Sequence, residues 1–370
     1  MTRLWSLGLA LVGVLLIFVV QAAPAGAPAG RVKQTRSPIA TLAMDGSRVA
    51  YASGGTVYVW NVLTGATSTM KGKYSKHTSE VAIAGTRVEW ITRYVVGNSL
   101  QTQEHLFSAT IGSRGRLLAS GRRYLGGDVN AEAWYGRWIA GAVGSGKVLA
   151  VSTWWSARDG TCIGQKLSLV SSAGLKQIVV GPGAIISQSA DSGRIAVLRS
   201  EKAWPMYGQT TALETPVTVG VYSTSGALLK EIAPASAEEI ALTGNRLVVL
   251  TEANTLEVYN WKTGTLVHTW PIAATGRSRA GHLAAYGELA VYSVDPRSAA
   301  ARKLHVMRLT TGKDVVLATG RGSGYYGRDA TIGPRGLVYA ITYREHARPG
   351  TPERGKLVFV PLAKVLRAVS

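Results

Sequence analysis

The chain has 370 residues, 46% of them hydrophobic, which is enough material for one large domain or two ordinary ones. Charged residues make up only 17% and glycine is abundant at 43 residues, a mix that suits a sheet protein with many turns better than a helical one. The formal net charge of +20 favours an anionic partner or reflects an arginine-preferring source, and the single cysteine, Cys162, excludes an intramolecular disulfide.

The first 23 residues have the pattern of a secretory signal peptide. Arg3 gives a positive start, an unbroken apolar run extends from Leu4 to Val20, and small residues follow in "QAAPAGAPAG". We therefore expect residues 1–23 to direct secretion to the cell exterior. The apolar run is slightly long for a signal peptide, so an uncleaved membrane anchor is the alternative. Residues 24–37 are predicted to form a short basic linker.

A unit of four short strands recurs through residues 38–370. Its outer half is a hairpin with a Gly turn, as in "TVYVWNVLTGATSTM" (residues 56–70) and "TLEVYNWKTGTLVHTW" (residues 255–270). Its inner half is an apolar strand, a second Gly turn and another apolar strand. Gly suits both turns because a tight hairpin needs a positive φ at one position. The inner turns place seven glycines 39–61 residues apart: Gly46, Gly85, Gly146, Gly193, Gly244, Gly287 and Gly336.

Seven copies of a four-stranded antiparallel meander predict an all-β fold, a seven-bladed β-propeller. No helical period stands out after the signal segment, so we expect no helix in the domain. Six or eight blades is the alternative, because the first strand of the third blade (residues 134–181) is ambiguous. The segment "RVKQTR" (Arg31–Arg36) could pair with the last blade instead of forming a linker, but a strand at Lys364–Val369 is expected to complete that blade without it.

The repeats resemble those of WD40-like and quinoprotein (PQQ-repeat) propellers. The motif Y-x-W-x-T-G at Tyr259–Gly264 is similar to the quinoprotein repeat, whereas Trp60-Asn61 stands where a WD40 repeat has its Trp-Asp pair. The resemblance implies a propeller and, by analogy of fold, a binding or interaction module. Quinoproteins that hold the cofactor often have eight blades and an adjacent pair of cysteines, so with one Cys we expect no cofactor.

The two faces of the predicted ring differ. With the strands of each blade named A to D from the axis outward, the A–B and C–D turns share one face and the B–C and D–A connections share the other. The turns are tight, as in Asp45-Gly46 and Thr311-Gly312. The connections are long almost everywhere and rich in Arg, Lys and aromatics, as in "SGRRYLGGDVNAEAWYGR" and "WWSARDGTCIGQ". We call this second side the long-loop face and expect function there, because a rigid scaffold positions functional loops.

The candidate binding residues are aromatic and arginine residues of the long-loop face. Aromatic rings offer stacking surfaces, and Arg anchors carboxylate or phosphate through two hydrogen bonds. The competing interpretation is that Trp154 and Trp155 end a strand and cap the core, while the Arg side chains are merely solvated. The candidates are Arg122, Arg123, Tyr124, Trp154, Trp155, Arg158, Trp204, Tyr207, Arg277, Arg279, Tyr325, Tyr326 and Arg328.

Catalytic and metal motifs are weak. "GAVGSGKV" lacks the Ser or Thr of a phosphate loop, and "GSGYYG" is an isolated match with no helix after it. No His has metal-ligand spacing, although His77, His282 and His346 fall on the long-loop face. That face also carries Asp128, Asp159, Asp295, Asp329 and Glu345, which would serve an exported hydrolase or lyase if two of them met at the channel mouth.

The sequence thus predicts a secreted propeller that binds an envelope polymer, a glycan or a protein, with no catalytic residue, metal or cofactor. We expect a monomer, no nucleic-acid partner, and membrane contact only through an uncleaved N-terminal segment. The alternatives are an exported propeller hydrolase or lyase and a purely structural envelope subunit. Two carboxylates and a His at the channel mouth would favour the enzyme, and a broad Arg-aromatic face would favour binding.

Overall fold

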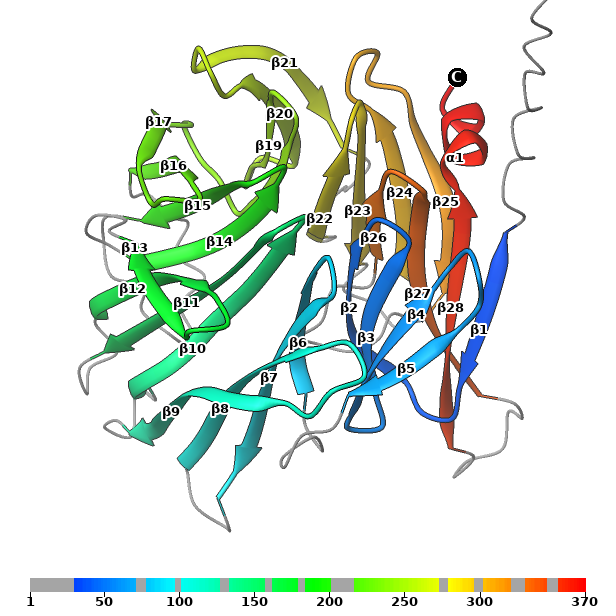
Figure 1. Ribbon diagram of the computed structural model, residues 1–370. Helices are drawn as coiled ribbons and strands as arrows, with labels where there is room; N and C mark the ends of the chain where they lie inside the picture. Colours follow the sequence, from blue (N-terminus) through cyan, green and yellow to red (C-terminus); the bar gives the residue numbers. More distant parts are fainter. Residues whose placement is uncertain are drawn as a thin grey trace, which may run out of the picture.

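The fold is a ring of seven blades, each with four antiparallel strands, and it confirms the predicted seven-bladed β-propeller (Figure 1). The computed structural model describes residues 30–70, 78–96, 101–126, 133–156, 162–178, 184–200, 216–272, 279–295, 302–320, 330–344 and 352–370. Within these ranges no helix is long and apolar enough to cross a bilayer. The predicted signal segment lies outside them and stays a prediction.

The first three blades follow one another along the chain. Blade 1 contains β2 (Ile39–Asp45), β3 (Arg48–Ser53), β4 (Thr56–Asn61) and β5 (Thr67–Met70). Blade 2 contains β6 (Thr78–Ala84), β7 (Arg87–Val95), β8 (Gln101–Thr110) and β9 (Arg116–Gly126). Blade 3 contains β10 (Ala133–Ser145), β11 (Val148–Ser156), β12 (Cys162–Val170) and β13 (Leu175–Ile178).

The remaining blades complete the ring. Blade 4 contains β14 (Ala184–Asp191), β15 (Arg194–Ser200), β16 (Val217–Ser223) and β17 (Leu228–Ile232). Blade 5 contains β18 (Glu239–Thr243), β19 (Arg246–Leu250), β20 (Thr255–Asn260) and β21 (Thr265–Pro271). Blade 6 contains β22 (Arg279–Tyr286), β23 (Leu289–Asp295), β24 (Arg302–Arg308) and β25 (Asp314–Gly320). Blade 7 contains β26 (Ala330–Gly333), β27 (Gly336–Arg344), β28 (Glu353–Pro361) and β1 (Arg31–Thr35).

Blade 7 corrects two expectations. Residues Arg31–Thr35 are not a linker: they form β1, which pairs antiparallel with β28 as the outermost strand of the last blade. Residues Leu362–Ala368 form the helix α1, not a closing strand, and its side chains Val365 and Val369 are buried against blades 6 and 7. The first strand therefore closes the ring, so the outer edge of β28 is paired (Figure 1).

The predicted turn glycines have the backbone conformation that the sequence requires. All seven inner turn glycines have positive φ, from 54° at Gly244 to 149° at Gly336. The outer turns follow the same rule, for example at Gly65 and Gly264, both near 82°. The stretch from Thr255 to Trp270 forms β20 and most of β21, the outer strand pair of blade 5 as expected. The tight turns share one face of the ring, which we call the turn face.

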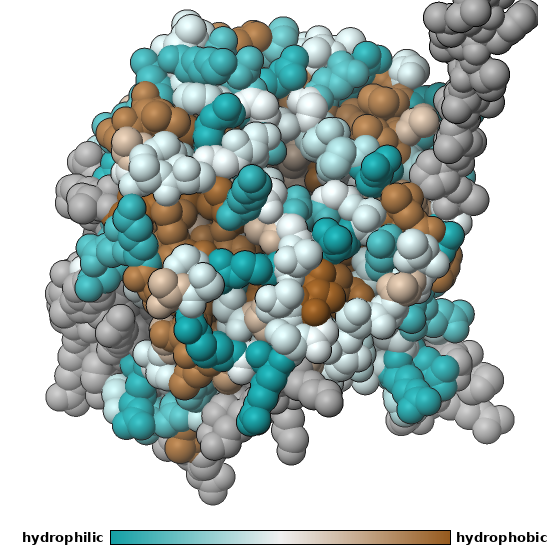
Figure 2. Space-filling view, viewed as in Figure 1, coloured by the Kyte–Doolittle hydropathy of each residue, from teal (hydrophilic) through white to brown (hydrophobic). Residues whose placement is uncertain are grey.

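The hydrophobic core lies between blades, as seven clusters of buried side chains. Each cluster joins the facing surfaces of two neighbouring sheets; Trp60 and Phe359, for instance, pack between blades 1 and 7. Exposed large apolar residues lie mainly on the outermost strands, such as Leu229 on β17 and Leu266 on β21. On the side of the molecule seen in Figure 2, hydrophobic residues are interspersed with hydrophilic ones. Burial between blades explains how the ring is stable without disulfides.

Polar side chains also link the innermost strands of neighbouring blades. In three blade pairs, the last residue of an innermost strand accepts a hydrogen bond of 2.6–2.7 Å from the turn-glycine N–H of the next blade. An arginine three residues later donates to the carbonyl of the same glycine at 3.2–3.3 Å. We call this arrangement the glycine clamp; it comprises Asp45 and Arg48 on Gly85, Asp191 and Arg194 on Gly244, and Thr243 and Arg246 on Gly287.

Blades 2 and 3 share one continuous sheet of eight strands. The outermost strand of blade 2, β9, pairs with the first part of β10 over Arg122–Gly126 and Ala133–Arg137. The segment predicted to be a long loop between these blades is therefore largely strand. In Figure 1, β7–β9 lie at the lower left and β10–β12 lie at the left.

Candidate functional site

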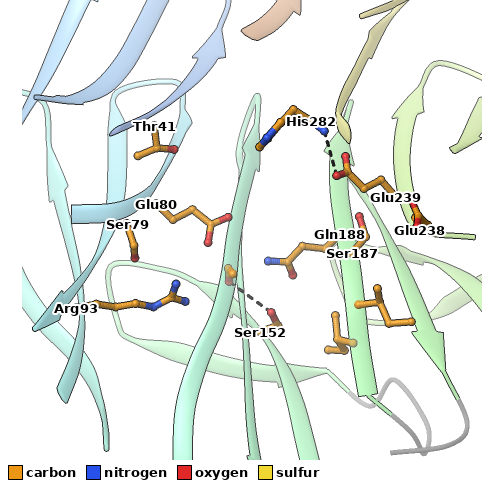
Figure 3. A pocket seen from close by; sticks show the side chains of 13 residues that line it. Thr41, Ser79, Glu80, Arg93, Ser152, Ser187, Gln188, Glu238, Glu239 and His282 are labelled. Atoms are coloured by element: carbon orange, nitrogen blue, oxygen red, sulfur yellow. Dashed lines mark hydrogen bonds between the residues drawn. The ribbon is translucent and has the colours of Figure 1, made fainter. Parts of the chain in front are cut away.

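A polar cavity of about 340 Å³ lies on the ring axis at the end that adjoins the long-loop face (Figure 3). One residue from the innermost strand of each of six blades lines it, always four residues before the last residue of that strand. These ring-position residues are Thr41, Glu80, Gly141, Ser187, Glu239 and His282. Residues from six separate parts of the sequence therefore meet at one place.

β-Bulges shape the wall of this cavity. The register of the A–B pair shifts by one residue in blades 1, 2, 3, 4 and 6, between Ile39 and Thr41 in blade 1 and between Thr78 and Glu80 in blade 2, for example. A bulge adds one unpaired residue, bends the strand and changes where its side chains point. In blades 1 to 4 the ring-position residue comes directly after the bulge. Four of the six ring-position residues therefore have the same local backbone distortion next to them.

Glu239 joins the cavity wall to the next blade. Its two carboxylate oxygens accept hydrogen bonds from the backbone N–H groups of His282 at 3.0 Å and Leu283 at 2.7 Å. His282 has a positive φ of 58°, a conformation that is uncommon for a residue with a side chain. The Glu239 contacts hold the bulged backbone at this point. Ser187 likewise joins the cavity wall to the next blade, because its Oγ accepts a hydrogen bond from the N–H of Ile240 in blade 5 at 3.2 Å.

Glu80 and Gln188 approach each other over Gly141. A Cβ atom at Gly141 would lie 2.8 Å from Nε2 of Gln188 and 3.5 Å from both carboxylate oxygens of Glu80. Figure 3 shows the Glu80 carboxylate and the Gln188 amide pointing into the same space from opposite sides. Gly141 has no positive φ, so the reason for glycine here is room for these two polar groups and not backbone conformation.

Arg93 supplies a fixed cation at the edge of the cavity. Its Nε donates to the buried carboxylate of Glu104 at 2.8 Å, and its Nη2 donates to the carbonyl of Ile139 at 3.1 Å. Glu104 in turn accepts from the N–H of Ile139 at 2.7 Å. Arg93 and Glu104 together bind both backbone polar groups of one residue of blade 3, Ile139, so the guanidinium is held in place by contacts between the two blades.

The cavity can hold a small polar group but has no metal-ligand cluster among the described residues. It offers carboxylates (Glu80, Glu238, Glu239), one imidazole, one amide and several hydroxyl groups. No three His, Cys, Asp or Glu residues in the described ranges are grouped so that they could bind a metal. A second, smaller cavity of about 110 Å³ lies on the ring axis towards the turn face. It is lined largely by small residues such as Ala82, Ala142 and Ala241.

Few of the thirteen predicted binding residues can be placed completely. Arg122 is exposed and Tyr124 half-buried, both on β9 with Arg123 between them. Trp154 and Trp155 belong to β11, not to the loop after it, and Arg279 begins β22. The others lie outside the described residues: Arg158, Trp204, Tyr207, Arg277, Tyr325, Tyr326 and Arg328.

The strand register brings five of these residues into one part of the molecule. Arg122 of β9 pairs with Arg137 of β10, which pairs with Trp155 of β11. Two residues along, Tyr124 pairs with Tyr135. Residues predicted from two separate loops, 122–124 and 154–155, are therefore brought together in the eight-stranded sheet. This sheet and the axial cavity both adjoin the long-loop face.

The predicted carboxylates are not those that line the cavity. Asp295 forms an ion pair with Arg302, while Asp128, Asp159, Asp329 and Glu345 lie outside the described residues, as do His77 and His346. Only His282, of the residues considered for chemistry, lines the cavity. Glu80, Gln188 and Glu239 were missed because they look like ordinary polar positions of a strand. The position of Glu80 and Glu239, four residues before the end of the innermost strand, is the signal that could have identified these two; Gln188 directly follows the equivalent residue, Ser187.

Comparison with known proteins supports the fold. No family model matches the chain, and no curated protein matches it. The WD40 β-propeller domain of Doa1 is similar in structure over 91% of this chain and 98% of its own, with a TM-score of 0.50 and 9% sequence identity. The computationally designed Ika8 protein aligns over 89% of this chain and 98% of its own, with a TM-score of 0.45 and 15% identity. The Doa1 likeness identifies a β-propeller repeat protein and carries no information on a ligand.

Proposed function

We propose that the protein is an extracellular binding module that holds an envelope polymer, a glycan or a protein on its long-loop face. The observation that carries this proposal is the position of the axial cavity, where polar side chains from six blades meet on the same side as the variable connections. A propeller provides a rigid ring for such a face, and ligand sites are concave regions with a few convergent polar groups. The extracellular location rests on the apolar N-terminal segment.

Binding to fractionated envelope material tests this proposal. The purified protein should co-sediment with one class of material, either wall polymer, glycan or envelope protein. Exchange of Arg122 for Ala should weaken that binding, and exchange of Arg114 should not, because Arg114 is exposed in the β8–β9 turn on the turn face. Equal retention of both variants would show that the long-loop face does not bind the material.

A propeller hydrolase or lyase is the second candidate, favoured by three carboxylates (Glu80, Glu238 and Glu239) and one histidine in a single cavity. Glu80, Glu239 and His282 line it together, although both oxygens of Glu239 already accept backbone hydrogen bonds. Glu80 is the carboxylate to test for a role in acid–base chemistry, because its side chain points into the cavity opposite the Gln188 amide. If the protein releases products from an envelope polymer, Glu80→Gln should abolish that release and leave the fold intact. No release by the unchanged protein from any fraction would argue against an enzyme.

A further inference from the structure

Blade 2 extends past blade 1 on the long-loop face. In blade 1, β3 ends at Ser53, and a tight turn at Gly54 and Gly55 returns the chain to β4. Ser53 in blade 1 and Thr92 in blade 2 are equivalent positions, because each lies seven residues after the inner turn glycine of its blade. The strand β3 ends at this position, whereas β7 continues for three more residues to Val95. The strands β8 and β9 extend equally far. Among the described residues, the part of this sheet beyond Thr92 therefore has no strand of blade 1 facing it.

Five described residues form the surface that this extension presents towards blade 1. On β7 and β8, Trp90 and Phe107 face blade 1 in the core, and side chains two residues apart on a strand share a face. Tyr94 lies four residues after Trp90 on β7 and Gln103 lies four residues before Phe107 on β8, so both side chains are on the face towards blade 1. Gln103 pairs with Tyr94 on one side and with Arg122 of β9 on the other, which places Arg122 on the same face. We call this surface the blade 2 ledge: Tyr94, Gln101, Gln103, Arg122 and Tyr124.

The ledge is anchored in the core by a series of aromatic rings. Trp90, which is fully buried, stacks on Phe107 with ring centroids 5.5 Å apart. Phe107 contacts His105 at 6.2 Å, and His105 stacks on Tyr94 at 5.6 Å with nearly parallel planes. The Tyr94 hydroxyl donates to Oε1 of Gln103. These contacts fix Tyr94 in place, so a ligand that binds it orders little additional structure.

We infer that the blade 2 ledge binds a carboxylate-bearing polysaccharide, an inference that rests on the proposed function. Tyr94 and Tyr124 lie about 12 Å apart, given the spacing of strands and residues in a sheet, and their rings offer stacking surfaces for sugar units. Gln101 and Gln103 lie between them and offer amide groups for hydroxyls. Arg122 is exposed, and its guanidinium can bind a carboxylate through two parallel hydrogen bonds.

Charge complementarity selects an anionic ligand. The five ledge residues include one cation and no carboxylate, and the nearest acidic residue along β8, Glu104, is buried on the opposite side of the sheet and paired with Arg93. Beyond the ledge, the register adds Arg137 and Tyr135 on β10 opposite Arg122 and Tyr124. On the ledge itself, Arg122 lies next to Tyr124 along β9 and across β8 from Tyr94, an arrangement that suits a chain molecule with a repeating acidic unit.

Affinity measurements with defined polymers test the ligand class. The probes are polygalacturonate, which has sugar rings with carboxylates, dextran, which has sugar rings without charge, and poly-L-glutamate, which has carboxylates without sugar. We expect polygalacturonate to bind at least about tenfold more tightly than either of the others, since each lacks one of the two interactions. Equal affinity for poly-L-glutamate would overturn the inference in favour of charge alone, and equal affinity for dextran would exclude recognition of the carboxylate.

Variants of β9 test the location. Arg122→Ala and Tyr124→Ala should each weaken polygalacturonate binding by about tenfold, whereas Arg116→Ala should leave it unchanged, because Arg116 is exposed on the same strand at its turn-face end. Unfolding temperatures equal to that of the unchanged protein exclude misfolding as the cause. If the Arg122 and Tyr124 variants bind polygalacturonate as well as Arg116→Ala does, but Arg122→Ala still weakens retention on envelope material, the proposed function stands and the ligand assigned to the ledge is wrong. If no envelope material or polymer is retained, both fail.

Discussion

Glu89 is a buried acid at the interface between blades 2 and 3. It lies on β7 with no exposed surface, and neither of its carboxylate oxygens has a hydrogen-bond partner in the described part of the chain. Burial raises the pKa of this carboxyl to about 8, and Arg87 offsets the rise only in part. Glu89 is therefore protonated at neutral pH in the folded protein. In the unfolded chain it is ionised above its ordinary pKa of 4.5.

This difference predicts that stability falls with rising pH. Below pH 4.5 the Glu89 carboxyl is protonated in both the folded and the unfolded protein, and its contribution to stability is fully present. Between pH 4.5 and 8 it is protonated only in the folded protein, so the free energy of unfolding decreases as the pH rises. The Glu89→Gln variant has no such titration, and its stability relative to the unchanged protein should rise by about 5 kcal/mol across this window. Denaturant unfolding of both proteins at several pH values measures it. Parallel pH profiles would show that Glu89 is not buried as described.

At the scale of elements, the glycine clamp predicts which polar residues of the innermost strands stabilise the ring. Asp191 accepts the Gly244 N–H at 2.6 Å, and the Gly244 carbonyl receives both Arg194 and the indole N–H of Trp261. Asp191→Ala leaves the Gly244 N–H without this partner, so the free energy of unfolding should fall by about 1–2 kcal/mol. Arg114→Ala, at an exposed turn, is the control and should change it by less than about 0.5 kcal/mol. Equal effects would show that the clamp contributes nothing.

Elements with a local signature could be predicted, and elements defined by their partners could not. Gly46 and Gly264 identify hairpins because their positive φ is a property of the turn itself. The helix α1 also has a local signature, since Leu362, Val365, Leu366 and Val369 recur at helical spacing, but the expected closing strand at Lys364–Val369 hid it. The bulge before Glu80 has no such signature, because it arises from the packing of innermost strands around the axis.

At the scale of the molecule, ring closure depends on contacts between the two ends of the described chain. The pairing of β1 with β28 spans more than 300 residues, and no short-range pattern in "RVKQT" distinguishes a peripheral strand from a basic linker. The candidate site shows the same limit. Six ring-position residues of different types converge only because seven blades close, so the cavity could not be deduced from any one repeat.

Closure by β1 makes the N-terminal boundary of the folded domain sharp. All five β1 residues pair with β28 in register from Arg31–Phe359 to Thr35–Gly355. A chain that starts at Gly30 should unfold like the full-length protein, whereas one that starts at Arg36 should lose about 3 kcal/mol of stability, since each strand hydrogen bond contributes roughly 0.5–1.5 kcal/mol.

The second truncation should also associate, because the unpaired edge of β28 can accept a strand from another chain. Thermal unfolding together with light scattering measures both effects. A synthetic peptide with the sequence of residues 30–36 should restore the monomer and the unfolding temperature when added to the shorter chain, and a scrambled peptide of the same composition should not. Identical stability of the two truncated chains would mean that β1 is an accessory strand and that three strands suffice for blade 7.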